Sequence, residues 1–471
     1  MLLTKNKILI LLFLIPILSY SSDGNNKNSK ITTKESSTFI SPSTVKEIRT
    51  QFNKLPKEDI WWTVNGKDML WNNKNLHQIF PTVNVYRNGP ISVLENDNNN
   101  DIGRIIVNTP HGDMKFNDFI EHKESTVMGV VIAYKGKIIF ESYPRMQKHE
   151  KPIYWSVSKV FPATILRILE EQNRLNVDKP INHYLKDLNN TSYAGIKVRN
   201  ILDMASGLDC PDNYETFESC YYLYSMSIGD GFRNELAEDT PYNFVKNTKI
   251  KRKAPQGKIF SYSGVDTFVL GWLVEELMGM PFQDALSQEI WSKIGAESDA
   301  SFIAPRYGIA ITHGGFLARM RDMIRFGMLF TPSYRKVNQN KIISESHLDL
   351  ILNGGNKNLL KNLYSNYYQN IESQDDGYLE DLLSNDREDS NATEFFSLPE
   401  GLKHNIYQWD AVYENDDFFK GGWAGQGLLI NPTKDIVAVW TGYKKNSEHD
   451  AREMRGIVRE LLNKFYKPTS K

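Results

Sequence analysis

The sequence predicts an α/β (α+β) protein in which an antiparallel sheet, flanked by helices, is combined with a mainly helical domain. Strand-like patterns occur towards both ends of the chain, at 127–140 and 406–440. The segment between them is dominated by apolar residues at helical spacing. We therefore expect strands 127–140 and 427–440 to lie in one antiparallel sheet, although more than half of the chain separates them.

The N-terminus has the pattern of an export signal. Lys5 and Lys7 precede an apolar run from Ile8 to Leu18, and Ser19-Tyr20-Ser21 supplies small residues for cleavage. This run is too short to span a bilayer as a helix. We interpret residues 1–21 as a signal peptide and expect an exported protein, periplasmic or extracellular, without stable membrane insertion after cleavage. An uncleaved anchor or a buried helix is the alternative.

Residues 22–45 are rich in Ser, Asn, Lys and Thr, which predicts a disordered leader. Residues 46–113 form an N-terminal extension whose tryptophans, such as Trp61 and Trp71, predict that it packs onto the rest of the chain. An acidic run at 96–101 lacks the spacing of a calcium loop, so we interpret it as a surface turn.

The two cysteines are interpreted in the light of export. In an oxidising compartment Cys210 and Cys220 can close a short loop as a disulfide, whereas otherwise they would be two free, buried thiols. The net charge of −1 gives no basic surface that would predict nucleic-acid binding. We expect no metal and no cofactor, and the sequence leaves the oligomeric state open.

The predicted sheet domain comprises residues 114–155 and 406–471, and a mainly helical domain comprises residues 156–405. Turn residues 134–137 divide the first strand pattern into two short strands. Further strands are predicted at 406–413, 427–430 and 436–440, followed by a helix at 451–465. Residues 354–395 are polar and acidic, which predicts a surface insertion.

Helical patterns fill the region between these strands. Pro162 implies that the first helix begins near Ser158 or is kinked. A second helix at 198–205 should end at Gly207, and a third, from Val265, should end at Gly279. Further helices should begin at Pro281 and near Arg319. The aromatic segment 208–260 either lines a cleft or forms a core of long loops.

Ser156 and Lys159 lie where the strand pair gives way to the first helix. A helix there would place both side chains on one face, one turn apart. Burial and the field of the helix N-terminus both disfavour an ammonium, so the lysine could accept the serine proton and activate the hydroxyl. The alternative is that Ser156 is only a helix cap, because Ser-x-x-Lys also occurs at Ser43 and Ser333.

Two other segments carry residues suited to acyl transfer. Tyr262 stands just before the helix from Val265, where its hydroxyl could relay protons. The glycine-rich run 420–427 enters a strand, and backbone N–H groups there could bind an oxyanion. A hairpin turn or a β-bulge explains the same glycines without catalysis.

Together these segments resemble the serine β-lactamase-related hydrolases. This family includes class C β-lactamases, D-alanyl-D-alanine carboxypeptidases, family VIII-type esterases and 6-aminohexanoate-dimer hydrolase. The likeness rests on three blocks, at 154–159, 262–272 and 314–323, and covers roughly residues 114–466. It implies a β-lactamase/transpeptidase-like fold, in agreement with the fold class above.

The resemblance also implies a role for each residue type. Ser156 would be the acylated nucleophile, Lys159 its base and Tyr262 the proton shuttle to the leaving group. The N–H groups of Ser156 and Gln426 would form the oxyanion hole. Trp423 and Gly425 would contact the substrate.

Two departures from the family pattern affect the expected substrate. Gly264 stands where β-lactamases of this type carry asparagine, and Trp423 stands where they carry the lysine of Lys-Thr-Gly. That lysine helps to hold a substrate carboxylate, so its absence favours a small neutral ester or amide. Lys420 is a cation that could replace it. The alternatives are β-lactamase or D-alanyl-D-alanine carboxypeptidase activity, or a non-catalytic binding protein on the same scaffold.

Overall fold

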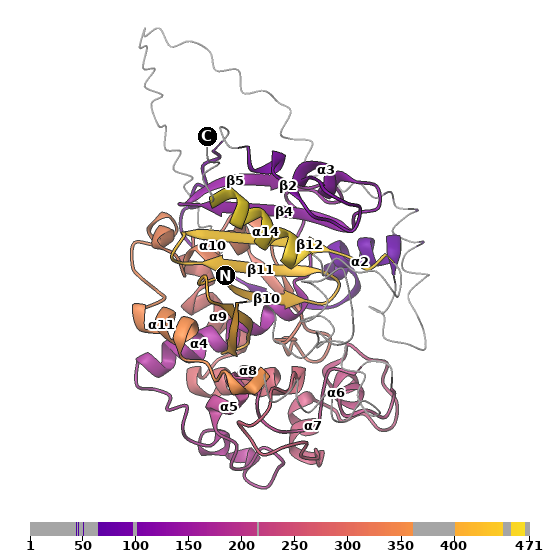
Figure 1. Cartoon of the computed structure of the whole chain (residues 1–471). Helices are drawn as coiled ribbons and strands as arrows, with labels where there is room; N and C mark the ends of the chain where they lie inside the picture. Colours follow the sequence, from indigo (N-terminus) through magenta and orange to yellow (C-terminus); the bar gives the residue numbers. More distant parts are fainter. Residues whose placement is uncertain are drawn as a thin grey trace, which may run out of the picture. The chain divides into compact units, whose positions relative to one another are not determined.

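The main sheet is assembled from two distant parts of the chain (Figure 1). Its seven strands follow the order β5-β4-β12-β11-β10-β9-β8, and every neighbouring pair is antiparallel. Strand β12 joins the two parts, with Ile436 opposite Tyr134 and Trp440 opposite Val130. The predicted pairing is therefore confirmed. The strands are β4 (Val127–Tyr134), β5 (Lys137–Ser142), β8 (Leu402–Ile406), β9 (Trp409–Tyr413), β10 (Phe418–Gly422), β11 (Gln426–Asn431) and β12 (Ile436–Gly442).

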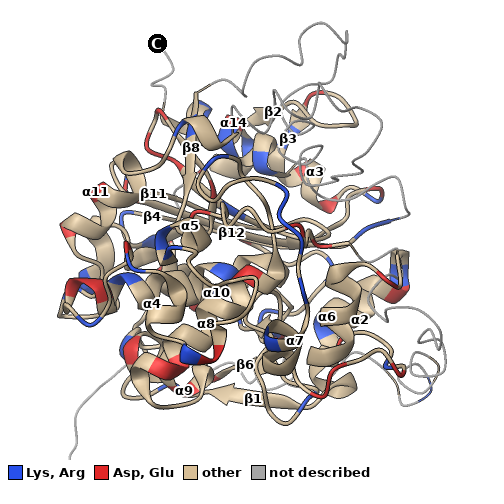
Figure 2. Ribbon diagram, turned by 90° about the horizontal axis from the view of Figure 1, so that it is seen from below, with Lys and Arg blue, Asp and Glu red and all other residues tan. Residues whose placement is uncertain are grey.

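This computed structural model describes residues 44, 46, 50, 65–97, 101–213, 216–360, 401–445 and 454–466. The predicted signal peptide, nearly all of the predicted leader and most of the predicted insertion at 354–395 lie outside these residues. In the described ranges, no helix has the length and apolar character needed to cross a bilayer. Lys and Arg are interspersed with Asp and Glu over the described elements (Figure 2), in keeping with the small net charge.

Different helices cover the two faces of the sheet. Val437 and Val439 share a hydrophobic core with helix α10 (Met320–Met328). Their neighbours Ile436 and Ala438 belong to a second core with helix α14 (Met454–Tyr466). Because successive side chains of a strand point to opposite faces, one run of apolar residues serves both cores.

The helical part of the chain lies between β5 and β8. Helix α8 ends at Gly279, whose φ of 68° is left-handed, as predicted. Helix α5 instead ends at Leu202, before Gly207, because Met204 adopts a φ of 54° that a helix cannot accommodate. The helices are α4 (Val160–Glu171), α5 (Val198–Leu202), α6 (Cys220–Ile228), α7 (Pro241–Asn247), α8 (Gly264–Met278), α9 (Phe282–Glu289) and α11 (Glu345–Asn353).

The described part of the N-terminal extension is integrated into the fold. It contributes helix α2 (Gly66–Ile79), strand β1 (Thr82–Val85) and strand β2 (Ile106–Val107). Strand β2 pairs with β3 (Met114–Lys115), which is followed by helix α3 (Phe116–Glu121). Strand β1 joins a second sheet of three strands with β6 (Ala300–Ile303) and β7 (Phe316–Leu317). Strands this short carry too few residues for a periodic pattern, so none of them was predicted.

One predicted strand is divided in the structure. The segment 406–413 contains the turn of the β8–β9 hairpin, since Tyr407 and Gln408 have φ values of 46° and 66°. Two successive left-handed residues are typical of a tight hairpin turn. The usual Asn-Gly or Asp-Gly signal is absent here, so the sequence pattern by itself predicts one continuous strand.

Candidate active site

Ser156 lies in a short 3-10 segment, η3 (Trp155–Lys159), directly before α4. Because α4 begins at Val160, Pro162 is the third residue of the helix, where a backbone N–H would have no partner within the helix. A start close to Ser158 is the alternative that the structure bears out, rather than a kink.

Ser156 and Lys159 face each other within this segment. The lysine Nζ donates to Ser156 Oγ at 3.2 Å and to the backbone oxygen of His313 at 2.9 Å. Lys159 is almost completely buried. Burial lowers the pKa of its ammonium to about 8, although the nearby Asp212 carboxylate opposes this effect. The geometry and the pKa together suit a base for the serine hydroxyl.

Tyr262 lies between two lysines. Its ring centroid is 4.7 Å from Lys159 Nζ and also 4.7 Å from Lys420 Nζ. Lys420 Nζ is 3.4 Å from the tyrosine hydroxyl. The hydroxyl therefore lies close to both lysine side chains, a position suited to passing a proton between groups near Ser156.

The cation beside Tyr262 is Lys420, the residue that the sequence offers in place of the lysine missing at Trp423. Lys420 stands on β10, is fully buried, and is 2.5 Å from Asp410 Oδ1 on β9. The second oxygen of Asp410 accepts the Gly421 N–H at 2.8 Å. Trp423 instead lies in the β10–β11 turn, with its ring edge-on to Trp155 at 5.3 Å. Lys420 therefore supplies the charge, and Asp410 neutralises it.

Asp212 is a site residue that the sequence did not predict. Its Oδ2 is 3.6 Å from Lys159 Nζ, and its Oδ1 accepts the Gly264 N–H at 2.5 Å. A Cβ at position 264 would lie 2.8 Å from the Tyr221 ring and 2.9 Å from the His313 ring. The space for an asparagine side chain is therefore taken. Asp212 follows Cys210 by two residues, but no pattern in the chain places it beside Lys159.

His313 organises the other side of Lys159. Its ring nitrogens contact two hydroxyls, Nε2 with Tyr221 at 3.0 Å and Nδ1 with Tyr224 at 3.1 Å. Burial holds the pKa of the imidazole well below its usual range, so the ring is neutral and donates through only one nitrogen. The ring thus anchors the segment whose carbonyl binds Lys159. The tyrosine pair is fully buried and part of the core, which favours the structural alternative for this part of segment 208–260.

The residues predicted for the oxyanion hole and the substrate contact lie around the β10–β11 turn. Gly425 has a φ of 85° in this turn, and Gln426 pairs with Gly422 directly after it. The Gln426 side chain donates to the backbone oxygens of Trp423 and Ala424 in the turn at 3.1 and 3.3 Å, and it bonds both backbone groups of Gly442, so it ties the turn to the end of β12. A Cβ at Gly422 would lie 2.4 Å from the Tyr154 oxygen, which brings β10 directly against η3. The oxyanion role of the Ser156 and Gln426 N–H groups stays a prediction.

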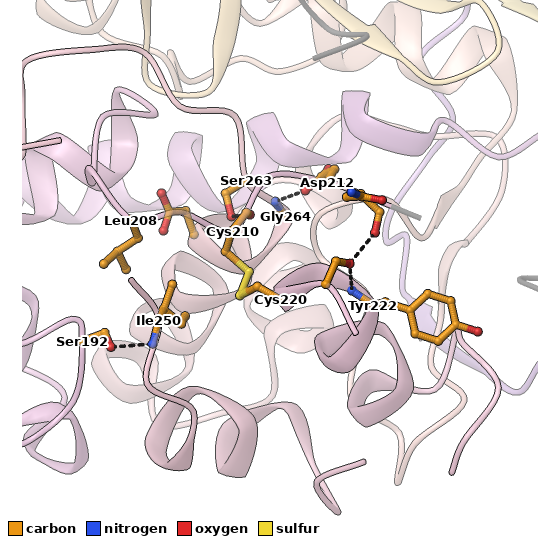
Figure 3. The surroundings of a disulfide bond; sticks show 12 residues. Ser192, Leu208, Cys210, Asp212, Cys220, Tyr222, Ile250, Ser263 and Gly264 are labelled. Atoms are coloured by element: carbon orange, nitrogen blue, oxygen red, sulfur yellow. Dashed lines mark hydrogen bonds between the residues drawn. A yellow bond between two sulfur atoms is a disulfide. The ribbon is translucent and has the colours of Figure 1, made fainter. Parts of the chain in front are cut away.

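Cys210 and Cys220 form a disulfide bond in the structure (Figure 3). It joins the loop that carries Asp212 to the first residue of α6. Over the described residues, no group of three or more His, Cys, Asp or Glu side chains is arranged to hold a metal ion.

Comparison with known proteins identifies the family. A sequence model described as Beta-lactamase matches residues 115–463. The 6-aminohexanoate-dimer hydrolase of Paenarthrobacter ureafaciens is 24% identical over 396 residues, which cover 83% of this chain and 89% of that protein. A Bacillus anthracis structure assigned as a 6-aminohexanoate-dimer hydrolase superposes with a TM-score of 0.66 at 20% identity, covering 88% of this chain and 96% of that one. EstCE1, a hydrolase with promiscuous acyltransferase activity, gives 0.51 at 16% identity, covering 71% and 93% of the two chains. The chain thus belongs to the beta-lactamase family and is a serine hydrolase with the β-lactamase/transpeptidase-like fold.

Proposed function

We propose that this hydrolase cleaves an ester or amide bond of a small, neutral substrate through an acyl-enzyme at Ser156. The observation that carries this proposal is the charge balance of the site. Each lysine beside Tyr262 has its own carboxylate partner, Asp212 for Lys159 and Asp410 for Lys420. A substrate carboxylate would therefore meet no uncompensated positive charge from these two lysines.

The reaction follows from the positions of three side chains. Lys159, in its neutral form, accepts the proton of Ser156, and the oxygen attacks the substrate carbonyl carbon. The resulting oxyanion would be stabilised by the N–H groups of Ser156 and Gln426. Tyr262 delivers a proton to the leaving alcohol or amine as its bond to the carbonyl carbon breaks, and it regains one from Lys159. Water then attacks the acyl-enzyme ester, which releases the acid and regenerates Ser156.

The charge balance also explains why a carboxylate is disfavoured. Asp212 is partly exposed, with 13% of its side chain accessible, and would repel an anionic group close to Ser156. If Lys159 and Lys420 stay paired with Asp212 and Asp410, the substrate forgoes a charge-assisted contact with either lysine, worth about 1.5–3 kcal/mol. This difference corresponds to roughly one to two decades in affinity.

We expect kcat/KM for a short-chain neutral p-nitrophenyl ester to exceed that for the cephalosporin nitrocefin by at least about tenfold. Both substrates give coloured products, so the two rates can be measured with one enzyme preparation. A nitrocefin rate that rivals the ester rate would restore β-lactamase as the leading function.

A variant of the ion pair separates the effect of charge from that of shape. Asp410→Asn keeps the size of the side chain but leaves Lys420 without its counter-charge. If Asp410 neutralises the site, this change should shift the ratio of nitrocefin to ester turnover towards the anionic substrate. An unchanged ratio in a folded variant would contradict this explanation of specificity.

We also propose that the protein is exported to the periplasm or the extracellular space. The signal-like N-terminus supports export, and the Cys210–Cys220 disulfide is of a kind that persists in oxidising compartments. Protein recovered from its native cells should begin near residue 22 and, when denatured without reductant, should show no titratable thiol. Intact N-termini and two free thiols in a cytoplasmic fraction would refute the proposal.

A further inference from the structure

The disulfide loop is tied to the active site at several points (Figure 3). The Cys210 carbonyl accepts the Ser263 hydroxyl at 2.8 Å, and Asp212 Oδ1 accepts the Gly264 N–H at 2.5 Å. These two donors directly follow Tyr262 in the sequence. At the other end of the loop, Ser219 caps α6 and its hydroxyl donates to the Asn213 carbonyl at 3.0 Å.

The bond between Cys210 and Cys220 closes this arrangement. Asp212 lies only two residues from one half-cystine, and the other half-cystine is the first residue of α6. Tyr221, the next residue of α6, contacts the His313 ring. The disulfide thus links the loop that carries the Asp212 carboxylate to the helix that contacts the His313 ring, and both Asp212 and the His313 carbonyl are partners of Lys159.

We infer that Asp212 is a positioning residue for Lys159, and that the Cys210–Cys220 disulfide belongs to the active site because it holds the Asp212 carboxylate there. Lys159 Nζ then has three fixed oxygen partners, namely Ser156 Oγ, the His313 carbonyl and the Asp212 carboxylate. The first two oxygens lie within hydrogen-bond distance of Nζ, and the Asp212 carboxylate, at 3.6 Å, adds an ion pair that favours this orientation of the ammonium.

This inference rests on the proposed role of Lys159 as the base. The charged and titratable groups that face Lys159 come from five segments: Asp212 on the disulfide loop, Tyr262 before α8, His313 before β7, Lys420 on β10 and Asp410 on β9. Among them, Asp212 is the carboxylate in direct contact with the Lys159 ammonium. Its removal should change both the orientation and the proton affinity of the base.

The sign of the pH effect follows from electrostatics. Lys159 acts as a base only when neutral, so kcat/KM rises as the pH passes upward through its pKa. A neighbouring anion stabilises the ammonium and raises that pKa. Asp212→Asn removes the anion, and the rising limb should therefore move to lower pH by about one unit or more. Loss of the fixed orientation should reduce the plateau of kcat roughly ten- to a hundredfold, with KM for a neutral ester little changed.

Asp209→Asn is the matched control. It removes the same charge from an exposed position on the same segment, just before Cys210. Asp209→Asn should leave the rising limb of kcat/KM against pH, and the plateau value of kcat, as they are in the wild-type enzyme. The positioning role of Asp212 would be overturned if Asp209→Asn shifted the pH dependence of kcat/KM equally. It would also be overturned if Asp212→Asn lowered the rate without moving the pH at which kcat/KM rises.

The disulfide is tested with the double variant Cys210→Ser/Cys220→Ser. Rates are normalised to the fraction of protein that reacts with a fluorophosphonate probe, so that partial unfolding does not enter the comparison. The normalised profile should move in the same direction as that of Asp212→Asn. Adding Asp212→Asn to the double variant should cause little further shift, because both changes remove the same contact. The disulfide would have no part in the active site if the double variant kept the wild-type pH–rate profile. The same conclusion would follow if the shifts caused by the double variant and by Asp212→Asn were additive.

Failure of this inference is distinguishable from failure of the proposed function. Full activity of a Ser156→Ala variant would remove the acyl-enzyme mechanism itself. An inactive Ser156→Ala variant combined with a wild-type profile for Asp212→Asn would remove only the role of Asp212.

Discussion

Alanine at Ser156 should reduce hydrolysis of an activated p-nitrophenyl ester by about four to six orders of magnitude, because the attacking oxygen is lost. The residue is half-buried in η3, and among the described residues its hydroxyl accepts a hydrogen bond from Lys159, so the fold should tolerate the change. The measurement is kcat under saturating ester. Intact-mass analysis after treatment with a fluorophosphonate should show an adduct on the wild-type protein and none on the variant.

The chain supplies a control with the same local sequence pattern. Ser333 and Lys336 repeat the Ser-x-x-Lys spacing, but the Ser333 hydroxyl donates to Asp435 at 2.6 Å at the surface of the β4–β12 region. Ser333→Ala should keep the wild-type rate and the adduct. Retained turnover in Ser156→Ala, or a lost adduct in Ser333→Ala, would place the nucleophile elsewhere.

Alanine at Lys159 should lower kcat by about three to four orders of magnitude, the usual cost of losing the base that activates a serine. The hydroxyl of Ser156 would keep its position on η3 but would have no group to take its proton. KM for a neutral ester should change little, since Lys159 is almost completely buried. Steady-state kinetics with the rate of fluorophosphonate labelling separate the two parameters, and labelling should become slow rather than absent.

Lys336→Ala serves as the matched control, because it removes a lysine at the same spacing from a serine outside the site. It should show wild-type kcat. If Lys159→Ala raised KM while leaving kcat intact, the lysine would be a binding group, and another base would have to be sought. Lys420 would then be the first candidate, because its Nζ is 3.4 Å from the Tyr262 hydroxyl.

Much of the architecture is determined by local sequence patterns. Apolar runs at 127–140 and 427–440 are typical of strands buried on both faces, and both lie in the main sheet. The start of α4, the end of α8 and the position of α10 follow from proline, glycine and apolar spacing. Errors occurred where such signals were weak or absent, as in the turn at Tyr407 and the four-residue strands β1 and β6.

Within the site, the sequence by itself determined that Ser156 and Lys159 are neighbours, because a spacing of three residues in a helical turn fixes that contact. Only the tertiary structure decided which charges surround them. Asp212 and Lys159 come from separate segments, and Lys420 reaches Tyr262 across 158 positions of the chain. Such contacts depend on how the sheet and the helices pack, and no local periodicity records them. The sequence therefore pointed to the proposed nucleophile and its proposed base, whereas packing decided that Lys420 lies beside Tyr262, that Asp410 pairs with it, and that a disulfide loop brings a carboxylate to Lys159.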